Sequence, residues 1–512
     1  MLATFSVAVS RRTLILIAGA LALCAIAVTT GLLFVRAYAR DYAVAALKTQ
    51  FASDVSMGSL ELSVFPSVRA TGTDLTLKFG GRSDLPPLIA IQRFTVSGSF
   101  AGLLRYPRHV GRVELTGLQI HVPPPDQRSG AKNPRKIALV VDEVVADGAV
   151  LEIMPQDPKK DALKFEMRRL TLTSASTNNP VTFHAELINA TPPGLIHSDG
   201  KFGPWAAEAP GDTPVSGQYT FRNANLGVFK GIKGTLASDG RYDGQLARIE
   251  VQGTTDVPDF ALTQVEHPMH LRATFAATVD GTNGDTDLHP VKAVLGKSAF
   301  EVSGTVERGA VAHGKEIDLS AKAANASLQD FLRLAVKGDP PPMTGAFSFN
   351  SKIKIPPGNT TVIAKLDLDG QFHASGVKFT DAGVQEKIAG LSHRAQGDPK
   401  DHDPDVTASL AGKFLLHNAT MDLPRLAFEL PGAHVDLDGH YGLATGMIDF
   451  KGTARLDATV SQMTTGIKSV LLKPVDRLFR HDGAGTLLPI AVSGTRDSPS
   501  FRLDIGQLTR EK

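Results

Sequence analysis

The chain has 512 residues, more than one compact hydrophobic core usually holds, so several domains or an elongated architecture are expected. Hydrophobic residues make up 42% and charged residues 21% of the sequence, which excludes disorder over most of its length. Lys and Arg (54) nearly balance Asp and Glu (52), so nothing indicates nucleic-acid binding. The single cysteine, Cys24, excludes disulfides within the chain.

Residues 14–35, LILIAGALALCAIAVTTGLLFV, form a long apolar segment without a charged side chain. A helix of this length measures roughly 33 Å at about 1.5 Å per residue, which is enough to span a bilayer. We therefore predict a single transmembrane helix that anchors the chain in a membrane. Apolar members spaced along this predicted anchor are Leu14, Ile17, Leu21, Cys24, Val28, Leu32 and Val35.

Arginines flank this segment on both sides, so the positive-inside rule does not decide its orientation. A short tail of residues 1–13 followed by a very long body favours a signal-anchor arrangement, with the tail in the cytoplasm and the body translocated. The alternative is a cleaved signal peptide, because Ala37-Tyr38-Ala39 matches the small-x-small cleavage pattern. The apolar segment is longer than a usual signal-peptide core, which favours a retained anchor.

From residue 53 onward, the dominant pattern is alternation of apolar and polar residues, the spacing of strands with one apolar and one polar face. Both residues 53–326 and residues 327–512 are therefore predicted to be β-rich. Clear alternating runs are 74–79, 316–319, 352–355 and 434–438. Turn signals between such runs include Ser238-Asp239-Gly240, Asp280-Gly281 and Pro357-Gly358. The pattern indicates a mainly β fold built on a long, twisted antiparallel sheet.

Short helices are expected at a few places. Residues 36–52 contain helix formers with an apolar stripe and predict a juxtamembrane helix. Residues 327–335 begin with Ser327, a residue that favours a helix N-cap, and have apolar side chains at helical spacing. Residues 463–480 show a similar stripe, which Pro474 bends or divides.

The common templates of catalysis are missing from the sequence. Gly296-Lys297-Ser298 lacks the preceding glycine of a phosphate-binding loop, because Val291 occupies that position. No G-x-S-x-G elbow and no H-E-x-x-H pair occurs. A group of acidic residues could in principle hold a divalent cation, but such groups are far more often solvated turns; it consists of Asp398, Asp401, His402, Asp403 and Asp405. We therefore predict no enzyme activity, no catalytic or metal-binding residues and no cofactor.

The apolar faces of the strands allow two interpretations. They can form a closed core, as in a sandwich or barrel. They can instead line an open groove if many amphipathic strands make one long, curled sheet whose polar face meets water. Periodicity does not separate these two arrangements.

Several motifs resemble the AsmA family of bacterial envelope proteins. Early in the chain, these are Asp54-Val55-Ser56-Met57-Gly58 followed by Phe65-Pro66, and Val110-Gly111-Arg112-Val113 leading to Gly117-Leu118. The resemblance is more specific from residue 327 onward. There it rests on Met343-Thr344-Gly345, Leu391-Ser392-His393-Arg394, Leu472-Lys473-Pro474-Val475-Asp476, Gly483-Ala484-Gly485-Thr486 and the closing segment 488–501, LPIAVSGTRDSPSF.

This resemblance implies a protein that is anchored in the bacterial inner membrane, projects into the periplasm and folds into an elongated β-groove. The implied function is binding or conducting phospholipid, or another lipid with acyl chains, in outer-membrane biogenesis. Candidate groove-lining residues are Leu366, Leu368, Phe372, Val377, Phe379, Ile448 and Phe450. The alternative is a non-enzymatic assembly or scaffolding factor for outer-membrane proteins or an envelope complex, which would bind partners through strand edges.

Overall fold

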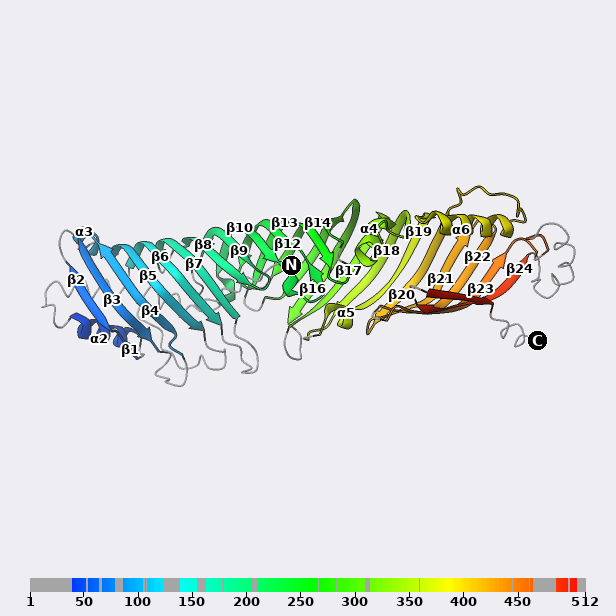
Figure 1. Cartoon of the computed structure of the whole chain (residues 1–512). Helices are drawn as coiled ribbons and strands as arrows, with labels where there is room; N and C mark the ends of the chain where they lie inside the picture. Colours follow the sequence, from blue (N-terminus) through cyan, green and yellow to red (C-terminus); the bar gives the residue numbers. More distant parts are fainter. Residues whose placement is uncertain are drawn as a thin grey trace. The chain divides into compact units, whose positions relative to one another are not determined.

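The fold is described from a computed structural model of the chain (Figure 1). The structure describes residues 39–51, 54–63, 67–78, 86–104, 106, 108–122, 139–153, 163–176, 179–204, 206, 210–265, 267–281, 284–308, 314–358, 360–443, 445–459, 461–463, 485–495 and 498–503. The predicted membrane anchor, residues 14–35, lies outside these residues. No helix within the described part of the chain is both long and apolar enough to cross a membrane.

The chain divides into two compact units. The first consists of Met1–Val228, Leu236–Thr255 and Ala276–Thr286, and the second of Phe229–Thr235, Asp256–Phe275 and Asp287–Lys512. The strands with residues in both units are β12 (Thr235–Gln245), β13 (Arg248–Leu262), β14 (Met269–Val279) and β15 (Thr286–Leu295). Both units are mainly β, which confirms the predicted fold class at this level.

The first unit is a sheet whose neighbouring strands follow one another in sequence. Its strands are β1 (Val55–Ser56), β2 (Ser59–Ser63), β3 (Val68–Leu77), β4 (Ile89–Gly98), β5 (Arg108–Val122), β6 (Leu139–Ile153), β7 (Leu163–Ser176), β8 (Val181–Ala190), β9 (Pro193–Phe202) and β10 (Pro214–Asn225). Its helices are α2 (Ala39–Phe51), α3 (Phe100–Leu104) and the 3-10 turns η2 (Pro210–Asp212) and η3 (Leu226–Val228). Helix α2 falls within the predicted juxtamembrane helix.

Strand pairing in this unit departs from the predicted antiparallel sheet at one point. Strands β1 and β2 both pair with β3, and β3 to β5 and β6 to β10 are antiparallel. Strand β6 instead runs parallel to β5, with Arg108 opposite Leu139 and Val122 opposite Ile153. The prediction of a purely antiparallel sheet is therefore wrong at β5–β6, because alternation along a strand does not encode the direction of its neighbour.

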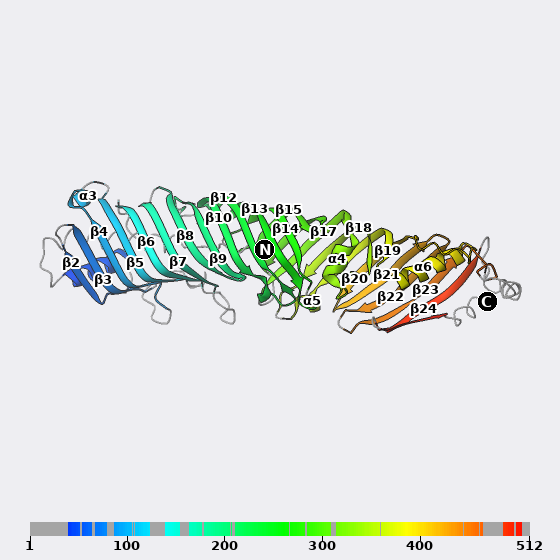
Figure 2. The same ribbon diagram turned by 45° about the horizontal axis from the view of Figure 1, so that its top comes forward.

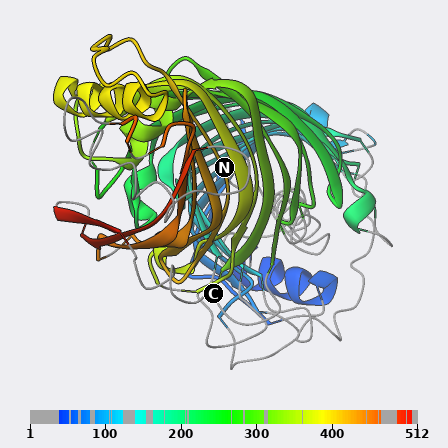
Figure 3. The same ribbon diagram turned by 90° about the vertical axis from the view of Figure 1, so that its right-hand side faces the viewer.

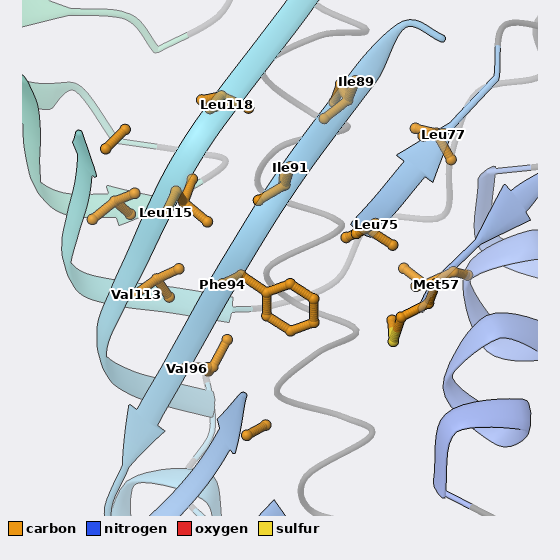
Figure 4. Packing of buried hydrophobic residues seen from close by; sticks show 14 of the residues in the cluster. Met57, Leu75, Leu77, Ile89, Ile91, Phe94, Val96, Val113, Leu115 and Leu118 are labelled. Carbon is orange, nitrogen blue, oxygen red and sulfur yellow. The ribbon is translucent and has the colours of Figure 1, made fainter. Parts of the chain in front are cut away.

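The apolar face of β3 to β6 forms a closed core. Its aliphatic and aromatic side chains are almost fully buried, with Phe94 only 2% exposed and Val113 0%. Ala43 and Leu47 of α2 belong to the same cluster, so this helix covers part of the sheet. Figure 4 shows Phe94 of β4 in the midst of these side chains, with Met57 and Leu75 on one side and Val113 and Leu115 on the other.

The second unit contains a run of long antiparallel strands and three described helices (Figure 2). Its strands are β11 (Ile232–Lys233), β16 (Ser298–Arg308), β17 (Lys315–Ser327), β18 (Met343–Ile355), β19 (Asp367–Phe379), β20 (Ala408–His417), β21 (Thr420–Leu430), β22 (Ala433–Gly442), β23 (Met447–Leu456), β24 (Thr486–Thr495) and β25 (Ser498–Leu503). Each strand from β16 to β25 pairs antiparallel with the next. Its helices are α4 (Leu328–Ala335), α5 (Val362–Lys365) and α6 (Ala382–Ala395).

The helices of the second unit agree only in part with the predicted ones. Helix α4 begins directly after its N-cap Ser327, as predicted. Helix α6 was not predicted, and the predicted helix at 463–480 lies almost entirely outside the described residues. In Figure 3 the yellow and orange strands of the second unit curve strongly, and α6 lies at one end of them.

Candidate functional site

One face of β16 to β25 is apolar over its whole width. The register places Phe349, Phe372 and Gly412 opposite one another on β18, β19 and β20, and the same row continues through Leu426, Leu437, Gly452 and Ile490. We call this surface the apolar face. Its larger members are Leu319, Phe347, Phe349, Ile353, Leu368, Phe372, Leu410, Phe414, Leu426, Phe428, Leu437, Ile448, Phe450, Ile490 and Val492.

All of these side chains are partly exposed, in contrast to the buried core of the first unit. The buried aliphatic side chains of β4 and β5, such as Ile91 and Val113, are at most 5% exposed. Because a folded chain gains free energy by removing such side chains from water, a wide and partly exposed apolar surface indicates a binding surface. The apolar face is thus the strongest candidate site among the described residues.

The opposite face of the same strands is polar. Lys354 of β18 lies within ion-pair distance of Glu316 (3.7 Å) and Asp318 (3.9 Å) of β17, and Lys322 lies 3.0 Å from Glu301. His417 at the end of β20 contacts Asp367 of β19 at 2.5 Å. Surface pairs of this kind contribute little stability, but they show that this face meets water and give the sheet one wet and one apolar side.

Phenylalanine rings form a contiguous track on the apolar face. Phe331 of α4 lies 5.4 Å from Phe347 and 5.3 Å from Phe349, measured between ring centroids. The track continues from Phe347 to Phe372 (6.3 Å) and from Phe372 to Phe414 (6.3 Å). These separations fall within the range of attractive aromatic contacts.

Glycines on neighbouring strands lie beneath several of these rings. A Cβ atom on Gly370 of β19 would lie 2.6 Å from the ring of Phe414, and one on Gly412 of β20 would lie 3.1 Å from Phe372. Each of these two strands therefore has a phenylalanine ring that lies over a glycine of the other strand. Phe450 lies over Gly439 of β22 in the same way, at 2.7 Å from the Cβ position. Rings that lie over glycine cover the backbone and do not project from the sheet.

Helix α4 is fixed over one end of the track. Asp330 accepts hydrogen bonds from the Lys297 backbone N–H (3.0 Å) and the Ser298 hydroxyl (2.7 Å) in the turn between β15 and β16. Ser298 Oγ also accepts a bond from the Ser327 N–H (2.9 Å). The Gly296-Lys297-Ser298 segment therefore binds the helix that places Phe331 on the apolar face.

Helix α6 covers one margin of the apolar face. Ala389 and Ala395 of this helix pack with Val377, Leu430 and Leu456 in a buried cluster at the ends of the strands. Asp381 caps the helix by accepting a bond from the Val384 N–H at 2.8 Å. This helical cover explains why Val377 is only 1% exposed whereas Phe372 on the same strand is partly open.

The predicted groove residues lie in three environments. Leu368, Phe372, Ile448 and Phe450 belong to the apolar face. Val377 is buried in the cluster beneath α6, and Phe379 is the partly exposed last residue of β19. Leu366 is the C-cap of α5 and precedes β19. Sequence reasoning missed Phe347, Phe349 and Phe414, although the alternation of β18 and β20 places them on the same face.

The acidic group at 398–405 forms a turn. Asp401 accepts a bond from the Asp403 N–H (3.0 Å), and Asp403 accepts one from the Asp405 N–H (2.9 Å). The His393 ring contacts the Asp403 carbonyl (2.8 Å) and the Asp401 carboxylate (3.1 Å). No cluster suited to a metal ion occurs among the described residues.

Comparison with known proteins identifies no relative of this chain. No protein-family model matches the chain, and no curated protein or solved structure matches it significantly. The similarity to the AsmA family therefore rests on the sequence motifs alone.

Proposed function

We propose that the apolar face of the second unit binds the acyl chains of membrane lipids. A strip of phenylalanine, leucine and isoleucine side chains that is partly open to water is the observation that carries this proposal. Each CH₂ group moved from water onto such a surface gains about 0.8 kcal/mol. A surface that continues from strand to strand lets a chain shift position while it keeps its apolar contacts.

The proposed setting is the bacterial envelope. Residues 14–35 would anchor the chain in the inner membrane, with the body in the periplasm, and the apolar face would hold or conduct phospholipid during outer-membrane biogenesis. The motifs that resemble the AsmA family support this setting, as does the length and apolar character of the N-terminal segment. Lipid binding on this face requires no catalytic group.

The test places a photoactivatable benzoylphenylalanine at Phe372 or Phe450 in the full chain, expressed in bacterial cells. Both replacements keep an aromatic ring on the apolar face. Matched controls place the same residue at His373 or Asp449, the adjacent and exposed positions on the opposite face of the same strands. After illumination, the chain is purified under denaturing conditions and weighed by mass spectrometry.

We expect adducts with phospholipid masses at positions 372 and 450 and none at 373 and 449. Equal lipid adducts on both faces would contradict the proposal, because they would report general exposure to membrane. Protein adducts without lipid at 372 and 450 would also contradict it and would favour an assembly factor.

A further inference from the structure

The apolar face has two long margins that are built differently. At one margin, α4 connects β17 to β18 and α6 connects β19 to β20; we call it the helix rim. At the other, β20 joins β21 and β22 joins β23 through short turns; we call it the turn rim. Of the helices described in this unit, the turn rim has only α5, which is four residues long. Figure 1 shows α4 and α6 along one margin and α5 at the other.

At the helix rim, hydrogen bonds connect α6 to several strands. The Gln385 side chain accepts a bond from the Phe379 N–H (2.9 Å) and donates to the carbonyls of Pro404 (2.9 Å) and Val406 (2.7 Å). The Ser392 hydroxyl donates to the Pro431 carbonyl (2.7 Å) in the turn between β21 and β22.

The C-terminal end of α6 is also held, because the Ala458 N–H beyond β23 donates to the Ala395 carbonyl (2.8 Å). The helix has 14 residues and so measures about 21 Å. The distance from β19 to β23 is about 19 Å at the usual strand spacing. Helix α6 thus closes this margin along the strands to which it is bonded.

The turn rim consists of short connections between strands. Asn418 and Ala419 have φ of 48° and 57°, the conformation of a two-residue hairpin turn. His417 contacts Asp367 at this margin (2.5 Å) on the polar face of the sheet, so the edge of the sheet here meets water. Tyr441, the only tyrosine in residues 287–512, lies in the last row of the apolar face, opposite Met421 and Ile448. A tyrosine suits the boundary between an apolar surface and water, since its ring is apolar and its hydroxyl polar.

The open width of the apolar face matches one acyl chain. From Leu368 near the turn rim to Ala374, which is 2% exposed, the strand covers about 20 Å. One leaflet of a bilayer has a hydrocarbon depth of about 15 Å. An ordinary membrane acyl chain therefore fits between the turn rim and α6.

We propose that a bound amphiphile lies along the direction of the strands and in one orientation only. Its polar head lies at the turn rim and its chain ends point toward α6. This inference rests on the proposed function and specifies the ligand as an acyl lipid whose head stays hydrated. At the turn rim the head reaches water beyond the last row of the apolar face, which avoids the cost of burying a polar group. At the helix rim, α6 is hydrogen-bonded to the strand ends and separates the apolar face from water, so the head group has no comparable access to solvent there.

The experiment uses the full chain in phosphatidylcholine vesicles that contain one of two photoactivatable phosphatidylcholines. One has a diazirine at the end of an acyl chain, and the other has it in the head group. After illumination, peptide mass spectrometry locates the attachments. We expect the chain-end probe to label peptides of α6 and the head-group probe to label the turns at 417–420 and 441–447. No substitution is needed, so misfolding does not confound the result.

The opposite distribution, or equal labelling of both rims by both probes, would overturn the inference. If that result came with phospholipid adducts at position 372 in the benzoylphenylalanine experiment, lipid binding would stand and only the orientation would fail. Absence of labelling at both rims together with absence of adducts at 372 would instead show that the proposed function itself is wrong.

Discussion

Phe414 of β20 lies over Gly370 of β19, so closely that a Cβ atom on the glycine would come within 2.6 Å of its ring. Gly412 and Phe372 repeat the contact in the other direction across the same pair of strands, at 3.1 Å. The glycines therefore act through the absence of a side chain, and they decide how far two phenylalanines project from the apolar face.

Substitution of these glycines should destabilise the fold in a graded way. Gly370→Ala also brings its Cβ atom 2.6 Å from the Asn350 carbonyl, so we expect a loss of about 1–3 kcal/mol, typical of overpacking. Gly412→Ala, whose nearest contact is 3.0 Å, needs a smaller shift and should cost less. The check is the thermal melting temperature of the full chain.

Gly390→Ala is the matched control. This glycine lies within α6, and its Cβ position has no atom within 4 Å. Alanine in a helix is favoured over glycine by about 0.5–1 kcal/mol, so this variant should melt at or slightly above the parent. Equal melting temperatures for the three variants would show that the rings move aside freely.

Asp330→Ala should loosen α4 without unfolding the unit. It removes the acceptor for the Lys297 N–H and the Ser298 hydroxyl, and we expect a local loss of about 2–3 kcal/mol because both bonds end on a carboxylate. Hydrogen exchange should become faster in Leu328–Ala335 and at Lys297, and should stay unchanged in β21 and β22.

The control on the same helix is Arg333→Ala. Arg333 forms an exposed ion pair with Asp339 at 3.2 Å, which contributes at most about 1 kcal/mol. If Arg333→Ala accelerated exchange as much as Asp330→Ala, the hydrogen bonds between Asp330 and the β15–β16 turn would not be what holds the helix.

Alternation along the strands predicted the mainly β fold, and the predicted groove residues include four of the fifteen larger members of the apolar face. Alternation could not say whether that face is open, because exposure depends on what packs above it and not on the strand itself. Val377 lies five residues after Phe372, so strict alternation would place it on the opposite face. An irregularity in the strand between Ala374 and Val377 brings it instead into the cluster that α6 buries. The direction of pairing was equally hidden, as the parallel β5–β6 pair shows.

Glycine made two segments of the sequence misleading. Ser238-Asp239-Gly240 predicted a turn, but these residues lie within β12, where Gly240 leaves room for the Tyr219 ring. Helix α6 was missed because it includes Gly383 and Gly390, which lower helical propensity. The signal that could have identified it is the N-cap Asp381 followed by apolar residues at helical spacing.

Calcium should not stabilise the protein through the acidic turn at 398–405. Asp401 and Asp403 accept bonds from backbone N–H groups of the turn, and Asp405 forms an ion pair with Lys378, so a cation would have to compete with the Lys378 ammonium for this carboxylate. We expect the same melting temperature with calcium chloride and with EDTA. A rise that grows with calcium concentration would reveal a site that binds only the folded state.

Alkaline pH should destabilise the first unit through Tyr219 and Tyr242. Burial raises the pKa of both hydroxyls above the ordinary value of 10.0, and Ser238 and Ser198 partly offset the shift by hydrogen bonding. Since their folded-state pKa is higher, the folded chain keeps protons that the unfolded chain releases. The stabilisation is complete below pH 10 and is lost as pH rises through the folded-state pKa.

The measurement is the urea midpoint as a function of pH, together with tyrosinate absorbance. Tyr219→Phe and Tyr242→Phe should each make the midpoint fall less steeply above pH 10, because one coupled ionisation is removed. Tyr106→Phe is the control: this side chain is 89% exposed, so its loss should leave the slope unchanged. If all tyrosines ionised together near pH 10 in the folded chain, the buried hydroxyls would not resist ionisation and the alkaline loss of stability would need another cause.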